Sequence, residues 1–352
     1  LALTSDGFLF AWGDNSNGQL GIGSVQQQLN PVQVNMNGVL SGKSITQIAT
    51  GYYHCLILID NNQLITWGRN TNGELGDGTY VDAQSPIIMN MSEFRGRNIS
   101  QITAGLNSLV LTSDGALFTW GPNTNSQIGD GTNDTRTKPT MIGLVPFTPI
   151  MAGAAHSMAL STSKNTYRQV LSWGWNGFGQ LGDGTITNRY VATFGALNGK
   201  KVMHLATGYA HTLAITSDGK LYGWGWSDNG QLGDGTNITR TTPVLVQDPN
   251  GNNLTVWQQV SAGYGHTLTI NDKGQVYAWG RNVEGQLGIG TTDDNLHSQP
   301  IKINSLSNIR IIQVEAGKYQ SLALTFDGQV YGWGNNSYGQ LGINSYTTTP
   351  NP

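Results

Sequence analysis

Four of the six histidines in this 352-residue sequence share one position in a recurring pattern, so they are the first candidates for metal binding or acid–base chemistry. Zinc needs its ligands about 2 Å from one shared ion, whereas equivalent points on neighbouring packed sheets lie about 10 Å apart. Asn107 and Gln320 stand at the same position in two further copies. Because an amide also satisfies buried backbone groups, we expect a structural role for these side chains and no metal site. The histidines are His54, His156, His211 and His266.

Gly-Asp-Gly loops are the second feature that suggests chemistry, because their carboxylates resemble calcium ligands and their glycines resemble a phosphate loop. A calcium loop alternates carboxylates over about twelve residues, and that spacing is absent here. A phosphate loop leads into a helix and occurs once, whereas these glycines recur in every copy and precede strands. We therefore predict Asx-type turns at the aspartates and glycine turns with positive φ. The aspartates are Asp77, Asp130, Asp183 and Asp234.

No Ser-His-Asp or Cys-His arrangement stands apart from the repeated residues, so we predict neither catalytic residues nor a cofactor. The single cysteine, Cys55, excludes an internal disulfide and a cysteine-based zinc site. Charged residues make up only 11% of the chain and the net charge is −3, which is atypical of a nucleic-acid-binding protein. No run of 18 apolar residues is present, so we predict no membrane span.

The pattern itself is a Trp-Gly dipeptide that occurs seven times at intervals of 51 to 55 residues. Even spacing over this many copies predicts a repeat architecture, in which each copy is one structural unit. The copies are Trp12-Gly13, Trp67-Gly68, Trp120-Gly121, Trp173-Gly174, Trp224-Gly225, Trp279-Gly280 and Trp333-Gly334.

One period predicts four strands and no helix. Apolar segments at 202–208, 213–216, 221–224 and 243–246 read as strands, and Asp218-Gly219 reads as a hairpin turn. Continuous apolar runs in other copies predict sheets that are covered on both faces. The sequence therefore predicts an all-β, seven-bladed β-propeller of four-stranded antiparallel blades.

These residues identify a family resemblance. The pattern Gly-x-x-His, Leu-Ala-Leu-Thr-x-Asp-Gly, Tyr-x-Trp-Gly-x-Asn-x-x-Gly-Gln-Leu-Gly-x-Gly resembles the repeat of the regulator-of-chromosome-condensation family, and it covers essentially the whole chain. The resemblance implies a single β-propeller domain over residues 1–352. It is specific for the fold and weak for the function, because one fold hosts many roles.

The chain ends fall inside a repeat. Leu1 lies eleven residues before Trp12, and Pro352 lies nineteen residues after Trp333, as Pro31 does after Trp12. We therefore expect one blade to be incomplete at the seam, either because the parent protein is longer or because the ring is left open. We favour a longer parent, whose further domains are then candidate partners.

The expected partner surface is the propeller face that carries the Gly-x-x-His turns and the loops after Trp-Gly. Tyr, Trp and Arg are the residue types enriched in interface hot spots. The predicted partner-binding residues are Tyr52, Tyr53, Tyr209, Tyr264 and Tyr319 from the turns, Arg69, Trp175, Trp226 and Arg281 directly after Trp-Gly, and Phe178 and Tyr338 three residues later.

We expect a non-catalytic scaffold that binds another protein, and three alternatives are weaker. The resemblance suggests guanine-nucleotide exchange on a small GTPase, but family exchange factors carry a β-wedge insertion and a basic tail that are not seen here. Light sensing in this family depends on Gly-Trp-Arg-His-Thr turns, and the turns here read Gly-Tyr-Tyr-His-Cys, Gly-Tyr-Ala-His-Thr and Gly-Tyr-Gly-His-Thr. The third alternative, a secreted inhibitor, would also act by binding another protein, so it is one form of the scaffold function.

The location of the protein is left open by the sequence. Six Asn-x-Ser/Thr sequons slightly favour secretion or a cell surface, although an Asn-rich chain acquires such sequons by chance. They begin at Asn90, Asn98, Asn133, Asn237, Asn253 and Asn335.

Overall fold

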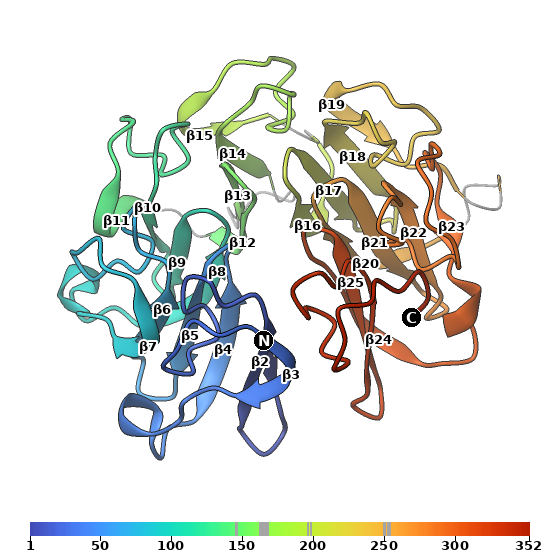
Figure 1. Cartoon of the computed structure of the whole chain (residues 1–352). Helices are drawn as coiled ribbons and strands as arrows, with labels where there is room; N and C mark the ends of the chain where they lie inside the picture. Colours follow the sequence, from blue (N-terminus) through green and yellow to red (C-terminus); the bar gives the residue numbers. More distant parts are fainter. Residues whose placement is uncertain (145–146, 162–168, 196, 198, 249–250, 252–254) are drawn as a thin grey trace.

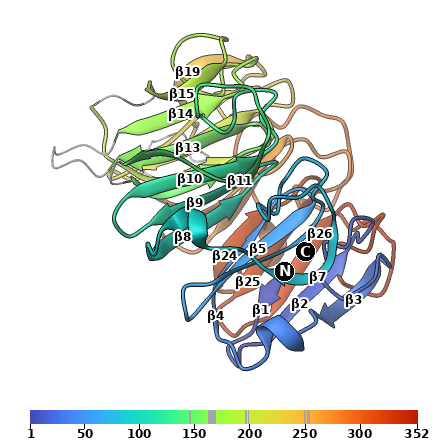
Figure 2. The same ribbon diagram turned by 90° about the vertical axis from the view of Figure 1, so that its left-hand side faces the viewer.

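A computed structural model describes the chain except for residues 145–146, 162–168, 196, 198, 249–250 and 252–254. The sequon at Asn253 therefore lies outside the described residues. The strands form seven antiparallel sheets arranged as a ring, as Figure 1 and Figure 2 show. Five sheets have four strands and two have three. The all-β, seven-bladed propeller predicted from the sequence is thus confirmed.

Each complete sheet begins at the centre of the ring and runs outward in chain order (Figure 1). The innermost strands are β4 (Ile45–Thr50), β8 (Ile99–Ala104), β12 (Phe147–Ala152), β16 (Val202–Thr207), β20 (Trp257–Ala262) and β24 (Ile311–Ala316). The second strands are β1 (Ala2–Leu3), β5 (His54–Ile59), β9 (Ser108–Thr112), β13 (His156–Ser161), β17 (His211–Thr216), β21 (His266–Asn271) and β25 (Gln320–Thr325).

The third strands end on the repeated Trp-Gly dipeptide. They are β2 (Leu9–Gly13), β6 (Leu64–Gly68), β10 (Ala116–Gly121), β14 (Val170–Gly174), β18 (Leu221–Gly225), β22 (Val276–Gly280) and β26 (Val330–Gly334). The outer strands are β3 (Gln28–Gln33), β7 (Ala83–Ile88), β11 (Arg136–Leu144), β15 (Arg189–Phe194), β19 (Arg240–Leu245) and β23 (Ile301–Lys302).

Helical structure in the described part of the chain is limited to three short 3-10 turns, η1 (Gly38–Leu40), η2 (Ser92–Phe94) and η3 (Asn304–Leu306). Among these residues no helix has the length and hydropathy needed to cross a membrane.

The core lies between the sheets. Every residue of β5, β17 and β21 is buried, because a second strand is covered on both faces by the neighbouring blades. Continuous apolar runs replace in-out alternation in such strands, as the sequence predicted. The tryptophans of the Trp-Gly dipeptides in six blades are fully buried between sheets, and they are Trp67, Trp120, Trp173, Trp224, Trp279 and Trp333.

The two three-stranded sheets lie at the seam. The sheet β1–β2–β3 has no innermost strand, and the sheet β24–β25–β26 has no outer strand. The incompleteness expected of one blade is therefore shared between two. The backbone N–H of Asn344 donates to the carbonyl of Leu29 over 3.0 Å, and the side chains of Asn30 and Asn344 are 3.1 Å apart. The two sheets thus contact each other directly at the outside of the ring.

Glutamines at one position of the inner strands join neighbouring blades. The side-chain amide of Gln47 donates to the Ser100 carbonyl over 2.9 Å and accepts from the Ile102 N–H over 3.0 Å. Gln101 makes the same pair of bonds to Ile150. A glutamine side chain therefore substitutes for a strand-to-strand ladder where the inner strands diverge around the axis.

Candidate functional site

The four repeated histidines tie one blade to the next. Nε2 of His54 lies 2.8 Å from the Ser108 hydroxyl, which in turn donates to the Glu74 carbonyl over 2.9 Å. Because the hydroxyl proton is used on the carbonyl, the hydroxyl accepts from the imidazole N–H. His266 meets Ser321 in the same way, over 3.0 Å.

Burial sets the protonation state of these histidines. It lowers the pKa of His54 and His211 to about 3, and of His156 and His266 to about 4. The rings are therefore neutral at physiological pH and serve as hydrogen-bonding groups between blades. Among the described residues, no three His, Cys, Asp or Glu side chains are grouped so that they could hold a metal ion.

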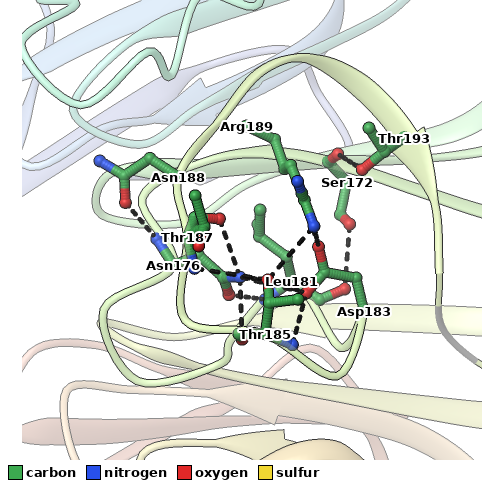
Figure 3. A network of polar contacts seen from close by, with 9 residues as sticks. All are labelled: Ser172, Asn176, Leu181, Asp183, Thr185, Thr187, Asn188, Arg189 and Thr193. Atoms are coloured by element: carbon green, nitrogen blue, oxygen red, sulfur yellow. Dashed lines mark hydrogen bonds and ion pairs between the residues drawn. The ribbon is translucent and has the colours of Figure 1, made fainter.

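The aspartates of the Gly-Asp-Gly loops form the predicted Asx turns, as Figure 3 shows for Asp183. Oδ1 of Asp183 accepts from the Thr185 N–H over 2.9 Å, and Oδ2 accepts from Nε of Arg189 over 2.6 Å. Burial alone would raise the pKa of Asp183, but the hydrogen bonds from Thr185 and Arg189 outweigh it and lower the pKa. Both carboxylate oxygens are thus engaged within the loop.

Asn176 completes this loop by bonding in both directions. Its Oδ1 accepts from the Leu181 N–H over 3.0 Å, and its Nδ2 donates to the Thr185 and Thr187 carbonyls (Figure 3). These hydrogen bonds fix the loop that follows Trp173-Gly174, and so they hold Trp175 and Phe178, which belong to this loop, in place.

Aromatic side chains from four consecutive blades meet on the face that carries these loops. We call this group the aromatic cluster. Ring centroids lie 5.8 Å apart for Trp175 and Tyr209, 4.5 Å for Tyr209 and Tyr264, and 5.3 Å for Tyr264 and Tyr319. Trp226 lies 6.3 Å from Tyr209 and 5.6 Å from Tyr264. The members are Trp175, Phe178, Tyr209, Trp226, Tyr264 and Tyr319, all of them half-buried.

Backbone hydrogen bonds position the cluster. The Tyr209 N–H donates to the Gly263 carbonyl of the next blade over 3.2 Å. Trp226 directly follows β18, and its N–H donates to the Ala210 carbonyl over 2.9 Å. The turn and the loop of one blade are therefore fixed to each other and to the neighbouring blade, so the aromatic surface is largely pre-formed.

Positive charge lies at one end of the cluster. The Arg281 guanidinium is 5.5 Å from the Tyr319 ring centroid and bonds Glu284 over 2.7 Å, and the bond to Glu284 raises the pKa of Arg281. Nζ of Lys318 lies 5.2 Å from the same ring centroid. Lys318 was not predicted from the sequence, although it occupies the turn position of Tyr209 and Tyr264, directly after the glycine.

A second aromatic pair lies near the cluster. The rings of Tyr52 and Tyr53 are 6.4 Å apart, and the Arg69 guanidinium is 5.1 Å from the Tyr53 centroid. Burial raises the pKa of Tyr52, and the phenols of Tyr209, Tyr53, Tyr264 and Tyr319 raise it further. Tyr52 and Tyr264 line the same hollow, which the turns after the inner strands surround.

A hollow of about 600 Å³ opens between this pair and the cluster. The glycines of the Gly-x-x-His turns line it, together with Tyr52, Tyr264 and Lys318. Tyr338 also borders the hollow and is 54% exposed, but it makes none of the ring contacts found in the described residues. Of the eleven predicted partner-binding residues, the structure therefore places six in the cluster and Arg281 beside it. A further three, Tyr52, Tyr53 and Arg69, form what we call the Tyr52 group, and Tyr338 lies apart from both groups.

Comparison with known proteins gives matches along nearly the whole chain. The regulator of chromosome condensation (RCC1) repeat matches residues 6–58, 61–111 and 114–160, and the RCC1-like domain matches residues 169–352. The ultraviolet-B receptor UVR8 of Arabidopsis thaliana is 35% identical over 81% of this chain, which spans 63% of that receptor. The match thus covers less than two thirds of this relative's own length.

Two further relatives agree with these matches. The mitochondrial RCC1 domain-containing protein RUG3 of Arabidopsis thaliana is 33% identical over 80% of this chain and 68% of its own length. Prp20p of Saccharomyces cerevisiae, described with its binding to Gsp1p and histones, has the same fold, with a TM-score of 0.86 at 22% identity over 99% of this chain and 86% of that one. On the repeats, the fold and the similarity to RUG3, this chain belongs to the regulator of chromosome condensation (RCC1) repeat family.

Proposed function

We propose that this chain is a non-catalytic scaffold that binds another protein through the aromatic cluster and the neighbouring Tyr52 group. The observation that carries the proposal is the contact of six half-buried aromatic rings from adjacent blades on one pre-formed face. Large aromatic side chains with little freedom left to lose are typical of interface hot spots. Prp20p, which shares the fold, is described with protein partners, and this supports a similar role here.

The polar groups with unusual environments do not favour catalysis. The buried histidines bond hydroxyl groups of the next blade. The loop aspartates bond a threonine of their own loop, and all but Asp77 also bond an arginine. Each of these groups recurs in several blades, whereas a catalytic site is one asymmetric constellation. We therefore expect no enzyme activity from these groups.

Affinity capture with a triple variant tests the proposal. We expect Tyr52→Ala/Tyr209→Ala/Tyr264→Ala to lose a partner that the parent protein captures and mass spectrometry identifies. The matched control is Tyr80→Ala/Tyr190→Ala/Tyr346→Ala, because these tyrosines are 59%, 49% and 56% exposed and belong to neither aromatic group. Equal capture by both variants would refute the assignment of the binding face.

Guanine-nucleotide exchange on a small GTPase is the alternative function. Its test is the release of labelled GDP from small GTPases in the presence of the chain. The scaffold proposal expects an unchanged release rate, and a rate increase that the triple variant abolishes would favour exchange instead.

A further inference from the structure

We propose that the aromatic cluster recognises a proline-rich segment in the polyproline II conformation, with an acidic residue beside its end at Lys318. This inference rests on the proposed function, because it names the chemistry of the partner that docks on the same face. Four observations carry the proposal: the row of aromatic rings, the hydrogen-bonding groups of the surface, the position of Lys318, and the length of the row from Trp175 to Tyr319.

The rings form an arc and not a closed box. Trp175, Tyr209, Tyr264 and Tyr319 come from consecutive blades of the ring and follow one another in steps of 5.8, 4.5 and 5.3 Å between centroids. Phe178 and Trp226 fill the outer side of the arc. An extended ligand with regularly spaced apolar rings fits such a surface, as proline-rich ligands fit other aromatic-lined grooves.

Hydrogen-bond donors are available on this surface. The hydroxyls of Tyr209, Tyr264 and Tyr319 can each donate as well as accept, whereas the indole Nε1 of Trp226 is buried without a partner among the described residues and is not an exposed donor. The nearest carboxylate, Glu284, is already bonded to Arg281. Because proline has no N–H, a polyproline II segment offers mainly carbonyl acceptors, which complement a surface of donors.

Lys318 provides the charge that specifies the acidic residue. Its side chain is exposed and lies over Tyr319 at the end of the arc. Arg69 and Arg281 pair with Glu74 and Glu284, whereas Lys318 has no carboxylate within ion-pair distance in the part of the chain that the structure describes. A ligand carboxylate beside Tyr319 would therefore meet an uncompensated cation.

The length of the arc sets the size of the motif. Polyproline II rises about 3.1 Å per residue, so at most about five residues span the successive centroid steps from Trp175 to Tyr319.

Two other ligand classes fit the surface less well. A methylated ammonium needs rings that enclose it, but these rings follow one another in an open row and have the cations of Arg281 and Lys318 beside them. A single-stranded nucleic acid needs a positive groove along its backbone. Here two of the three nearby cations are neutralised by Glu74 and Glu284.

The test uses three synthetic peptides and isothermal titration calorimetry with the whole chain. The first has five prolines followed by two aspartates, the second has five prolines followed by two asparagines, and the third replaces the prolines with alternating glycine and serine before two aspartates. We expect the first to bind at least about tenfold more tightly than the third, and about threefold more tightly than the second. No binding of the first at millimolar concentration would overturn the proposal, as would equal binding of the third.

Two variants localise the binding. We expect Tyr209→Ala/Tyr264→Ala to weaken the first peptide at least about tenfold, and Lys318→Ala to remove its advantage over the second peptide. The control Tyr80→Ala/Tyr190→Ala should bind like the parent protein, and thermal unfolding shows that all variants are folded. Unchanged binding by the folded Tyr209→Ala/Tyr264→Ala variant, or binding of oligo-dT in place of the peptide, would overturn the proposal.

The outcome separates this inference from the proposed function. If affinity capture depends on the cluster but the proline peptides do not bind, the docking face stands and the ligand chemistry is wrong. If capture is independent of the cluster, the proposed function fails whatever the peptides do.

Discussion

The indole Nε1 of Trp12 donates a 2.9 Å hydrogen bond to the carbonyl oxygen of Gln340, which lies 328 residues further along the chain. The same bond joins Trp173 to Gln127 over 3.0 Å and Trp333 to Gln286 over 2.9 Å, and it recurs in all seven blades. The repeated tryptophan therefore fastens each sheet to the preceding one, and the seam uses the same contact as the rest of the ring.

This hydrogen bond predicts which tryptophan can be replaced by phenylalanine with little loss of stability. Trp173→Phe removes the N–H that reaches Gln127 and leaves unfilled space in a fully buried position, so it should lower the free energy of unfolding by about 2 kcal/mol. Trp226→Phe is the matched control, because its indole N–H has no partner in the described structure. The free energy of unfolding of Trp226→Phe should fall by less than about 1 kcal/mol. Urea denaturation measures both, and equal losses would show that the indole bond contributes little.

The buried histidines predict a loss of stability in mild acid. An unfolded histidine titrates near pH 6.5, whereas burial lowers the pKa of His211 to about 3 in the folded chain. The unfolded state therefore binds more protons below pH 6.5. The contribution of these histidines to the free energy of unfolding is therefore fully present above pH 6.5. It falls as the pH decreases towards the pKa of the folded state, by up to about 1.4 kcal/mol per pH unit for each such ring.

His211→Asn isolates this effect, because Asn107 already serves at the same position of another blade. The variant should lose less stability than the parent protein between pH 6.5 and pH 4.5, as measured by urea denaturation at a series of pH values. Parallel curves for the two proteins would mean that His211 does not drive the acid sensitivity.

The fold could be predicted from the sequence because each blade repeats the same local signals. The Trp-Gly spacing gave the number of blades, and Asp218-Gly219 marked a hairpin between β17 and β18. The bonds between blades could not be predicted, because they join residues about fifty positions apart whose distance depends on the curvature of the ring. Gln47, which bridges β4 and β8, is an example.

The candidate site was predicted by repeat position, and its contacts were not. Trp175 and Phe178 both meet residues of the following blade, Tyr209 and Trp226. Tyr338 occupies the position of Phe178, but the first sheet places Asp14 where the blade after Phe178 places Trp226. Tyr338 therefore has no ring to contact there, a difference that residue types alone do not reveal.

Lys318 was missed for a different reason. Tyr, Trp and Arg are the residue types enriched in interface hot spots, whereas a lysine at the Tyr209 and Tyr264 position adds charge to the cluster because it lies over Tyr319. The sequence signal that marks Lys318 is its position directly after the turn glycine, where Tyr52, Tyr209 and Tyr264 stand in other blades.

The glycines of the Gly-Asp-Gly loops predict a contrast between two neighbouring substitutions. Gly129 and Gly131 both have positive φ, at 83° and 85°, so alanine is strained at either position by about 1 kcal/mol. An added Cβ at Gly129 would lie 2.6 Å from the Trp173 ring, whereas at Gly131 it would meet nothing within 4 Å. Gly129→Ala should therefore lose about 3 kcal/mol or more, and Gly131→Ala about 1 kcal/mol.

Thermal unfolding combined with urea denaturation compares the two alanine variants. If Gly129→Ala is no less stable than Gly131→Ala, close packing of the loop on the tryptophan is not what requires glycine there.

The Asx turns predict that one aspartate is more sensitive than its counterpart in another blade. Asp183 bonds Thr185 and Arg189, and only 7% of its side chain is exposed. Asp77 bonds Thr79 in the same way, but Ala83 stands where the other loop has Arg189. In Asp183→Asn, the amide would lose the ion pair and could turn its own N–H groups towards the guanidinium.

We therefore expect Asp183→Asn to lower the free energy of unfolding by about 2 kcal/mol and Asp77→Asn by about 1 kcal/mol, because only the first leaves an arginine without its partner. Urea denaturation at neutral pH measures the difference. Adding Arg189→Gln to Asp183→Asn should recover part of the loss, since the guanidinium is then absent. If the two single variants lose equal stability and Arg189→Gln restores none of it, the ion pair adds nothing to the turn.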